Sequence, residues 1–384
     1  MELAVVRRQG FRELHITLWP LPGERPSVLL WRLDTALREH QATVVKQDIF
    51  GSLDVQAETL GRMARLFGEI RWPVLWVEGQ SCAGSSIAGM QVLAVAGTAV
   101  EPVRLDGRIV GSTFQDAFAR HCYLADVRPA DVSVSNEAQA RQVFENIEAG
   151  LERTGMKMAH LVRTWLFLND ILSWYGPFNE VRRRFFEKRG LLGHLVPAST
   201  GVGVRNPANA ALVAGAWAVQ PTSPSLSLCE VSSPRQCPAP DYGSCFSRAV
   251  ELGTPDLCRL LISGTASIEP GGRSTRGGDM RGQINLTMGV IEAILAAREL
   301  RFSDVTRGIA YFRNAQDAGL FAEWCAEHRT ALPLLGTQAF VCRDELLFEI
   351  ELDAISVNPS TLGPPALSEG RTAFGRKSRR AKPH

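Results

Sequence analysis

The sequence has 384 residues, more than one ordinary domain requires, which predicts two domains or two closely packed repeats of one. Hydrophobic residues make up 45% and charged residues 21%, a composition that excludes a largely disordered chain, a collagen and a coiled coil. The net charge of +2 is uneven, because residues 359–384 carry +5 and the rest carries −3, so we expect no nucleic-acid surface on the body of the protein.

The N-terminal part of the sequence shows strands but no targeting signal. Residues 1–8 lack the basic and then apolar pattern of a signal peptide, so we expect a cytoplasmic protein. Residues 1–85 contain runs typical of strands, such as 13–19 and 43–50, and we interpret them as a strand-rich extension that could enlarge the first sheet.

Residues 86–221 are interpreted as a first domain half. A strand at 92–103 precedes a helix, and the apolar residues of this helix recur at helical spacing: Val143, Phe144, Ile147 and Leu151. A strand at 161–170, a second helix at 175–188 and a strand at 211–219 follow. The apolar run 210–219 is far shorter than the roughly 20 residues of a membrane helix, so no membrane contact is expected.

Residues 222–255, rich in Pro and Ser at their start, are interpreted as a linker to a second half at 256–358. This half repeats the order of the first. Its expected elements are a strand at 260–268, a helix with Leu286, Val290, Ile291 and Ile294 on one face, a strand at 305–314, a helix at 315–328 and strand-rich sequence at 339–353. We expect the basic segment 359–384 to be a disordered, solvated tail; weak contact with RNA or acidic lipid is the alternative.

The two halves are related by an internal repeat. Segment 139–170, shifted by 144 positions, matches 283–314 without a gap, and pairs Arg163 with Arg307 and Phe167 with Tyr311. The repeat predicts an α+β fold of two β-α-β-α-β halves, each a mixed sheet with two helices on one face. Since the other face must also be buried, we expect a homotrimer or an intramolecular pseudo-oligomer.

The eight cysteines give no sign of a metal site. None forms a Cys-x-x-Cys pair, and no histidine lies near the evenly spaced Cys229, Cys237 and Cys245. Reduced thiols fit this pattern better, and we expect neither a metal nor an organic cofactor.

Four short motifs occur in a fixed order after the first copy of the repeat, three before the second copy and one after it. They are Pro234-Arg235-Gln236, Phe246-Ser247-Arg248-Ala249, Ser263-Gly264-Thr265-Ala266-Ser267, and Cys342-Arg343 followed by Glu349-Ile350-Glu351. The repeat and the motifs resemble the Rid/YjgF superfamily, whose single domain normally trimerises, and within it the tandem-repeat chorismatase-like group. The resemblance implies a cofactor-independent enzyme that hydrolyses a small anionic enol ether, as in the conversion of chorismate to pyruvate and a cyclic carboxylate.

The resemblance implies catalytic roles for two residues of the last motif. Glu349 is the expected proton donor, because a buried carboxyl group has a raised pKa and keeps its proton near neutral pH; a solvated edge-strand residue is the alternative. Cys342 is the second catalytic candidate, at a position that distinguishes subtypes in the resembling group. An inert buried thiol is its alternative reading, because a nucleophilic cysteine requires a base or a cation beside it.

The other candidates are expected to bind the anionic substrate. The strand end Gly264-Thr265-Ala266-Ser267 offers backbone N–H groups and two hydroxyls, and the loop beyond it offers Arg273 as part of a mobile lid. Arg163 is a candidate carboxylate clamp, Tyr242 could close the pocket, and Arg343 completes the set. Each has a structural alternative, such as a surface ion pair or a loop without function.

One departure keeps other functions open. Simple Rid deaminases hold the substrate carboxylate with the arginine of a Pro-Ala-Arg-Ser motif, whereas this chain has Pro197-Ala198-Ser199-Thr200. This disfavours an enamine or imine deaminase, which remains an alternative. A catalytically silent protein that binds a small metabolite is the other alternative.

Overall fold

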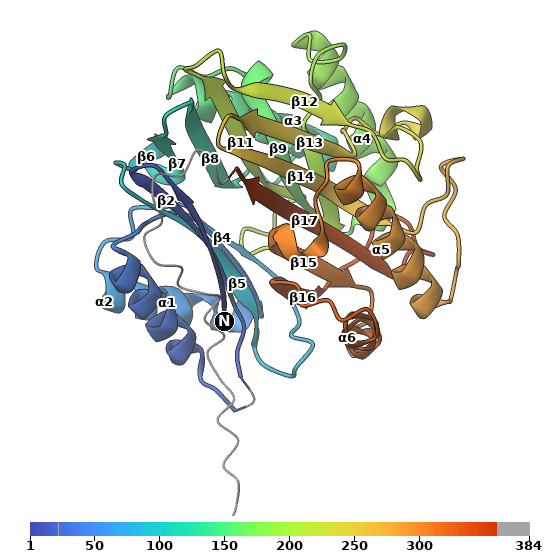
Figure 1. Ribbon diagram of the computed structural model, residues 1–384, viewed down its shortest axis with the longest axis horizontal. Coiled ribbons are helices and arrows are strands. Elements are labelled where there is room, and N and C mark those ends of the chain that lie inside the picture. The colour runs from blue at the N-terminus through green and yellow to red at the C-terminus, as the bar shows by residue number, and fades with distance from the viewer. Residues whose placement is uncertain (22, 359–384) are drawn as a thin grey trace, which may run out of the picture.

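The chain forms three sheets, each with two helices on its outer face (Figure 1). The computed structural model describes residues 1–21 and 23–358, so the expected basic tail, 359–384, lies outside the described residues. We call the three parts the N-terminal unit (residues 2–96), the middle unit (101–221) and the C-terminal unit (227–357), each built around one sheet.

The middle unit has a six-stranded mixed sheet in the order β10-β9-β11-β8-β7-β6, in which only β9 and β10 run parallel. Its elements are β6 (Glu101–Leu105), β7 (Arg108–Gln115), β8 (Ala119–Val127), α3 (Asn136–Glu152), β9 (Leu161–Leu168), α4 (Ile171–Lys188), β10 (Ala198–Gly203) and β11 (Leu212–Pro221). The expected apolar residues of α3 are all buried against this sheet.

The C-terminal unit repeats this topology in the order β12-β13-β14-β17-β15-β16. Its elements are β12 (Ser227–Val231), β13 (Ala249–Thr254), β14 (Leu257–Ala266), α5 (Met280–Ala296), β15 (Val305–Phe312), α6 (Ala318–Glu327), β16 (Leu334–Gln338) and β17 (Phe348–Val357). Both α5 and β15 begin and end 144 residues after α3 and β9, so the predicted repeat is confirmed.

The repeat extends to individual hydrogen bonds. Ser135 and Asp279, 144 positions apart, cap the two helices: their side chains accept the backbone N–H groups of Ala138 in α3 and Gly282 in α5. Gln139 and Gln283 are buried one turn later, and the Oε1 atom of each accepts a backbone N–H just before the last strand of its unit. These bonds fix each helix to the loop that leads into β11 or β17.

The N-terminal segment differs from its interpretation as a strand-rich extension. It forms a five-stranded sheet of its own, in the order β1-β2-β5-β3-β4, with two helices that were not expected. Its elements are β1 (Glu2–Arg8), β2 (Phe11–Leu18), α1 (Pro26–His40), β3 (Thr43–Gly51), α2 (Gln56–Phe67), β4 (Val74–Val77) and β5 (Ile87–Ala96). This is the topology of the other two units without their first strand, so the chain holds three units.

Two expected boundaries are corrected by the same sheets. The expected strand 92–103 covers parts of β5 and β6, which belong to different sheets. The expected linker 222–255 contains β12 and β13, which pair with each other at the edge of the C-terminal sheet. The strand β12 is short and mostly exposed, so its sequence lacks the apolar alternation that would have marked it.

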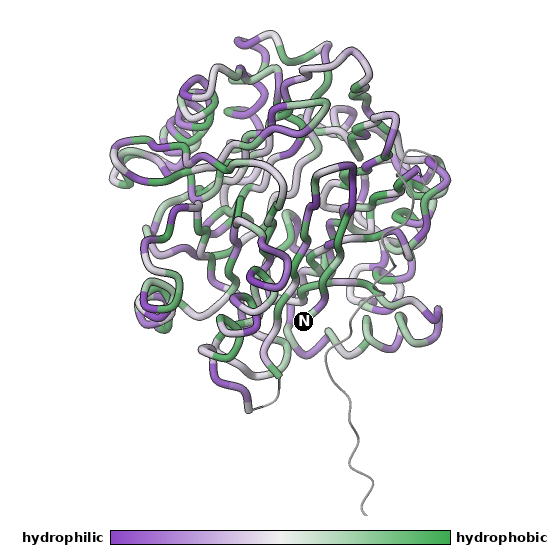
Figure 2. The backbone as a smooth tube through the Cα atoms, turned by 60° about the vertical axis from the view of Figure 1, so that its left-hand side comes forward, coloured by the Kyte–Doolittle hydropathy of each residue, from purple (hydrophilic) through white to green (hydrophobic). Residues whose placement is uncertain are grey.

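The helix-free faces of the three sheets pack against one another and form a core shared by all three units. Phe50, Phe167 and Tyr311 occupy equivalent positions on β3, β9 and β15 and meet at its centre, where the ring of Phe50 lies 6.0 Å from that of Phe167 and 6.4 Å from that of Tyr311. The strands of this interior are largely hydrophobic, and hydrophilic segments lie towards the outside (Figure 2). The chain is therefore an intramolecular pseudo-trimer.

Ion pairs also join the units. The guanidinium of Arg259 in the C-terminal unit donates to both carboxylate oxygens of Glu13 in the N-terminal unit, at 2.8 and 2.7 Å, and both side chains are buried.

Within residues 1–21 and 23–358, no helix is long and apolar enough to span a membrane.

Candidate active site

A cavity of about 240 Å³ lies between the middle and C-terminal units. The middle unit contributes α4 and β10; the C-terminal unit contributes β14, β17, the segment before β13 and the loop before β17. The residues that line this cavity include Tyr175, Asn179, Arg182, Ser199, Tyr242, Arg248, Gly264, Cys342, Arg343 and Glu349. The wall therefore forms only when the two units pack together.

Glu349 is a buried carboxyl group on the wall of this cavity, with 5% of its surface exposed. It lies on β17, opposite Ala266 of β14 and Tyr311 of β15. Burial raises the pKa of Glu349 to about 8, and the negative charge of Glu351 adds to the effect. The side chain is therefore protonated at neutral pH and faces the cavity as an acid.

Gly264 makes room for this carboxyl group. A Cβ atom at position 264 would lie 2.1 Å from the Oε1 atom of Glu349 and 3.2 Å from Thr200. A bulge in β14 places Ser263 and Gly264 together opposite β17, since the pairing passes from Ile262 directly to Thr265. The glycine of the Ser-Gly-Thr-Ala-Ser motif is thus explained by its contact with Glu349.

Glu351, two residues along the same strand face, is ionised. Its carboxylate accepts from Arg163 at 2.8 Å, from the indole N–H of Trp165 at 3.1 Å, and from Arg307. Burial acts to raise the pKa of Glu351, but Arg307 and Arg163 outweigh it and lower the pKa to about 2. Two neighbouring buried glutamates therefore have opposite protonation states, an arrangement typical of acid–base sites.

Three guanidinium groups surround the cavity: Arg182, Arg248 and Arg343. The hydrogen bonds of Arg182 go to Asn179 Oδ1 at 2.7 Å and to the hydroxyl of Ser199 at 3.5 Å.

Arg248 and Arg343 are held by polar groups without charge. Arg248 donates to the carbonyl of Cys237 at 3.0 and 2.9 Å, and Arg343 donates to the carbonyl of Gly272 at 2.8 Å. Among the described residues, no carboxylate lies within ion-pair distance of any of the three arginines. Their positive charges are uncompensated, so the cavity favours an anion.

Cys342 lies in the cavity as a protonated thiol. Burial, and secondly the nearby Glu349, raise the pKa of its thiol to about 12, and its side chain is hydrogen-bonded to Tyr175. A thiolate nucleophile therefore has no support from the geometry. The side chain instead occupies space beside the acid.

The structure brings six of the ten predicted site residues to the cavity wall: Glu349, Cys342, Tyr242, Gly264, Ala266 and Arg343. Thr265 and Ser267 are buried next to it, but their hydroxyls donate to backbone carbonyls of Ser263 and Thr275.

The two remaining candidates lie away from the cavity. The side chain of Arg273 is exposed and paired with Glu269, because both lie on the loop after β14. Arg163 is fully buried and points into the shared core, where its guanidinium binds Glu351, the carbonyl of Ile262 and the hydroxyl of Thr200. Arg163 thus forms an ion pair with Glu351 in this structure, and the geometry does not support its predicted role as a clamp for the substrate carboxylate.

Sequence reasoning missed two cavity arginines. Arg182 lies on the same face of α4 as Tyr175 and Asn179, seven and three residues earlier, and its guanidinium reaches Ser199. Ser199 of β10 occupies the position of the arginine in the Pro-Ala-Arg-Ser motif. Arg182 of α4 therefore places a guanidinium group beside the position where β10 has no arginine. Arg248 belongs to the motif Phe246-Ser247-Arg248-Ala249, and this membership could have indicated it as a candidate substrate-binding residue.

The three units differ at the position of Glu349. On the last strand of each unit, the residue paired with Phe50, Phe167 or Tyr311 is Gly89, Val213 or Glu349. A Cβ atom at Gly89 would lie 2.2 Å from a methyl group of Leu335, so the C-terminal unit fills that space with an apolar side chain. Of these three equivalent positions, only 349 carries a carboxyl group.

The chain is similar to known proteins in sequence and in fold. Residues 125–214 match the family described as endoribonuclease L-PSP. A stretch of 213 residues is 28% identical to a chorismatase of Streptomyces hygroscopicus, and covers 50% of this chain and 60% of that protein. A second stretch of 60 residues is 38% identical to a RutC family protein of Pasteurella multocida, and covers 16% and 43% of the two chains. The chain thus matches less than two thirds of the length of either relative.

A crystal structure of a chorismatase superposes with a TM-score of 0.65 over 91% of this chain and 99% of that one, at 18% identity. The chain has a chorismatase-like fold. The predicted resemblance to the Rid/YjgF superfamily and its tandem-repeat chorismatase-like group is confirmed. Since the superposition spans nearly the whole chain, the chorismatase-like fold includes the N-terminal unit that the sequence did not reveal.

Proposed function

We propose that the protein hydrolyses a small anionic enol ether, as a chorismatase does with chorismate, and that Glu349 is the proton donor. One observation carries the proposal: a buried, protonated carboxyl group lies in the same cavity as three arginines that have no carboxylate partner among the described residues. An enol ether that bears carboxylates requires both a proton at carbon and cations for its charges.

The proposed reaction begins with proton transfer from Glu349 to the methylene carbon of the enol ether. The double-bond electrons form the new C–H bond, and the positive charge is shared between the substituted carbon and the ether oxygen. Glu349 becomes a carboxylate beside this cation. Burial, which raises the pKa of Glu349, keeps the carboxyl group protonated at neutral pH, so that the proton is present when the substrate binds.

Water then adds to the cationic carbon, and its proton returns to the carboxylate of Glu349. The hemiketal that results then breaks its bond to the ring oxygen. Its hydroxyl proton passes to that oxygen, which leaves as the hydroxyl of the cyclic product, while the remaining C–O bond becomes the ketone of pyruvate. The sum is addition of one water to the substrate, with Glu349 regenerated.

The arginines are proposed to hold the carboxylates of the substrate. Arg182 and Arg248 are 2% and 3% exposed, so a carboxylate in the cavity would meet guanidinium groups that are already desolvated. Arg343 lies beside Tyr242, whose ring is 5.4 Å from its guanidinium carbon. The cations on both sides of the cavity suit a substrate with two carboxylates.

The alternative functions are an enamine or imine deaminase and a catalytically silent metabolite-binding protein. The position of Arg182 beside Ser199 keeps the deaminase in consideration, because it returns a guanidinium to the place of the missing arginine. Purified protein should be assayed for pyruvate release from chorismate and for ammonia release from an imine derived from an amino acid. Pyruvate release supports the proposal, ammonia release supports the deaminase, and neither, with saturable chorismate binding, supports the silent protein.

A further inference from the structure

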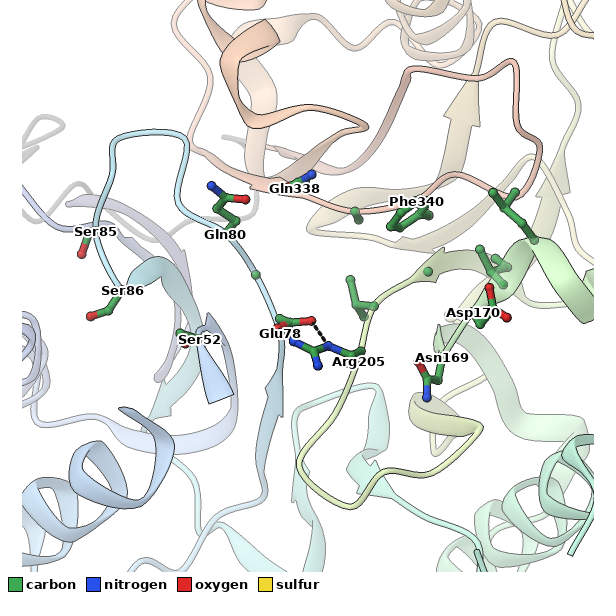
Figure 3. A pocket seen from close by; sticks show the side chains of 16 residues that line it. Ser52, Glu78, Gln80, Ser85, Ser86, Asn169, Asp170, Arg205, Gln338 and Phe340 are labelled. Carbon is green, nitrogen blue, oxygen red and sulfur yellow. Dashed lines mark hydrogen bonds and ion pairs between the residues drawn. The ribbon is translucent and has the colours of Figure 1, made fainter. Parts of the chain in front are cut away.

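A second cavity, next to the candidate active site but lined by different residues, has a volume of about 570 Å³ (Figure 3). Its wall contains the equivalent segment of each unit, where the chain leaves β4, β10 and β16: residues 78–80, 203–205 and 338–340. It therefore lies at one end of the pseudo-threefold axis, and we call it the axial cavity. Its volume is within the range of small-molecule sites.

Backbone hydrogen bonds between the units hold this wall in place. The N–H of Glu78 donates to the carbonyl of Arg205 at 2.8 Å, and the N–H of Gln338 donates to the carbonyl of Gln80 at 3.2 Å. Gly203 and Phe340 exchange two such bonds, at 2.7 and 2.9 Å. The three segments thus form a connected rim, so the cavity exists before any ligand binds.

The two sides of the axial cavity differ in chemistry. The N-terminal unit presents hydroxyl and amide groups, from Ser52, Ser85, Ser86 and Gln80, on one side of the view in Figure 3. Phe340 and Asp170 lie on the other side of this view. Ile171 and Leu172, the first residues of α4 after Asp170, also line the cavity. Phe340 and Leu172 are 44% and 37% exposed, unusual for large apolar side chains in this protein. A ligand that fits has hydroxyl groups at one end and a ring at the other.

The charges of the axial cavity disfavour an anion. Its charged residues are Glu78, Asp170 and Arg205, and Arg205 is already occupied by Glu78, to which its Nε donates at 2.6 Å. This leaves the carboxylate of Asp170 as the excess charge. The candidate active site, with its three arginines, has the opposite preference, so the two cavities select different molecules.

The two cavities are neighbours and share structural elements. Ile171 and Leu172 line the axial cavity, while Tyr175 and Gly176, one turn further along α4, line the candidate active site. Phe340 is likewise two residues before Cys342.

We propose that the axial cavity is a second binding site, for an uncharged compound with a ring at one end and several hydroxyl groups at the other, the chemistry of glycosides and nucleosides. The ring packs on Phe340 and Leu172, and the hydroxyl groups bind the serines and Gln80. This inference does not depend on the reaction proposed for the other cavity.

The experiment is a calorimetric titration with two matched probes, phenyl β-D-glucoside and phenyl β-D-glucuronide, which differ in one carboxylate. The glucoside should bind once per chain, and the glucuronide should bind several-fold more weakly because the charged residues of the cavity, with Glu78 paired to Arg205, leave one negative charge, that of Asp170. Ser86→Trp fills the hydroxyl side and should weaken glucoside binding roughly tenfold or more, about 1.4 kcal/mol. Ser225→Trp, at an exposed position outside the cavity, is the matched control and should leave it unchanged.

Three results would overturn the proposal: no saturable binding of the glucoside, equal binding of the glucuronide, or unchanged affinity in Ser86→Trp. Thermal melting checks that Ser86→Trp is folded. If it is not, Phe340→Ala takes its place, since it removes the ring contact from an exposed side chain and should also weaken glucoside binding.

Discussion

The substitution Glu349→Gln tests the protonation state of the proposed acid without a known substrate. In the folded protein the pKa of Glu349 is about 8, whereas the value for an exposed glutamate is 4.5. Between these two values the folded state keeps a proton that the unfolded state has released. The contribution of Glu349 to the free energy of unfolding therefore falls as pH rises from about 4.5 to about 8, at roughly 1.4 kcal/mol per pH unit, whereas glutamine makes no such pH-dependent contribution.

The expected magnitude follows from this window. At pH 5 Glu349 has lowered the free energy of unfolding of the wild type by less than about 1 kcal/mol, and at pH 7 by about 3 kcal/mol. From pH 5 to pH 7 the stability of Glu349→Gln relative to wild type should therefore rise by roughly 2–3 kcal/mol. Urea unfolding of both proteins at pH 5 and pH 7 measures this difference, in which all other titrating groups cancel. Glu345→Gln, at an exposed position of the preceding loop, is the matched control and should show no such gain.

The result that refutes the reasoning is a stability difference that does not grow with pH. Glu349 would then be ionised in the folded protein and could not donate a proton near pH 7. If the difference does grow, the same variant should lower turnover by roughly 10²–10⁴ on a substrate found by the pyruvate assay, because the glutamine amide cannot transfer a proton to carbon. Wild-type turnover in a folded Glu349→Gln would show that another group is the acid.

Three further predictions concern the same cavity. The pH profile of kcat should fall above about pH 8, as Glu349 loses its proton, and a profile that is flat to pH 9.5 would contradict the assignment. Gly264→Ala should lower turnover at least about 100-fold, because its Cβ takes the place of the carboxyl oxygen; unchanged kcat would show that the carboxyl is not fixed there. Arg182→Gln should raise KM roughly tenfold or more, while the same change at its exposed neighbour, Arg184→Gln, should not, as steady-state kinetics of both variants will show.

The repeat could be predicted from the sequence because its signal is local. Apolar spacing in α3 and α5 and the strands that follow lie 144 residues apart, and the structure reproduces these bounds. The N-terminal unit was missed because it shares the fold without this spacing. Its helix α1 nevertheless has a helical apolar pattern, Leu29, Leu30, Leu33 and Leu37, after Pro26 at its start, and this was the available signal.

The place of Glu349 on a strand face with Glu351 could be predicted, but the cations around these two residues could not. Strand alternation places Glu349 and Glu351 on one face, and the motif resemblance pointed to Glu349. Which arginine faces which glutamate depends on how two units pack, since Arg163 and Arg182 both belong to the middle unit but only Arg182 reaches the cavity. The spacing of residues along a single segment of the sequence does not show how that segment packs against another unit.

Because the three units belong to one chain, their equivalent positions can carry different residues. In a trimer of identical chains every junction has the same residues, whereas here the equivalent positions are Gly89, Val213 and Glu349. The one carboxyl that remains depends on both units that enclose it. The negative charge that helps to keep Glu349 protonated belongs to Glu351, and Glu351 stays ionised because Arg163 of the middle unit and Arg307 of the C-terminal unit bind it. The ion pair between Arg163 and Glu351 therefore does two things at once: it joins the units, and it helps to keep Glu351 ionised, whose charge adds to the effect of burial on the pKa of Glu349.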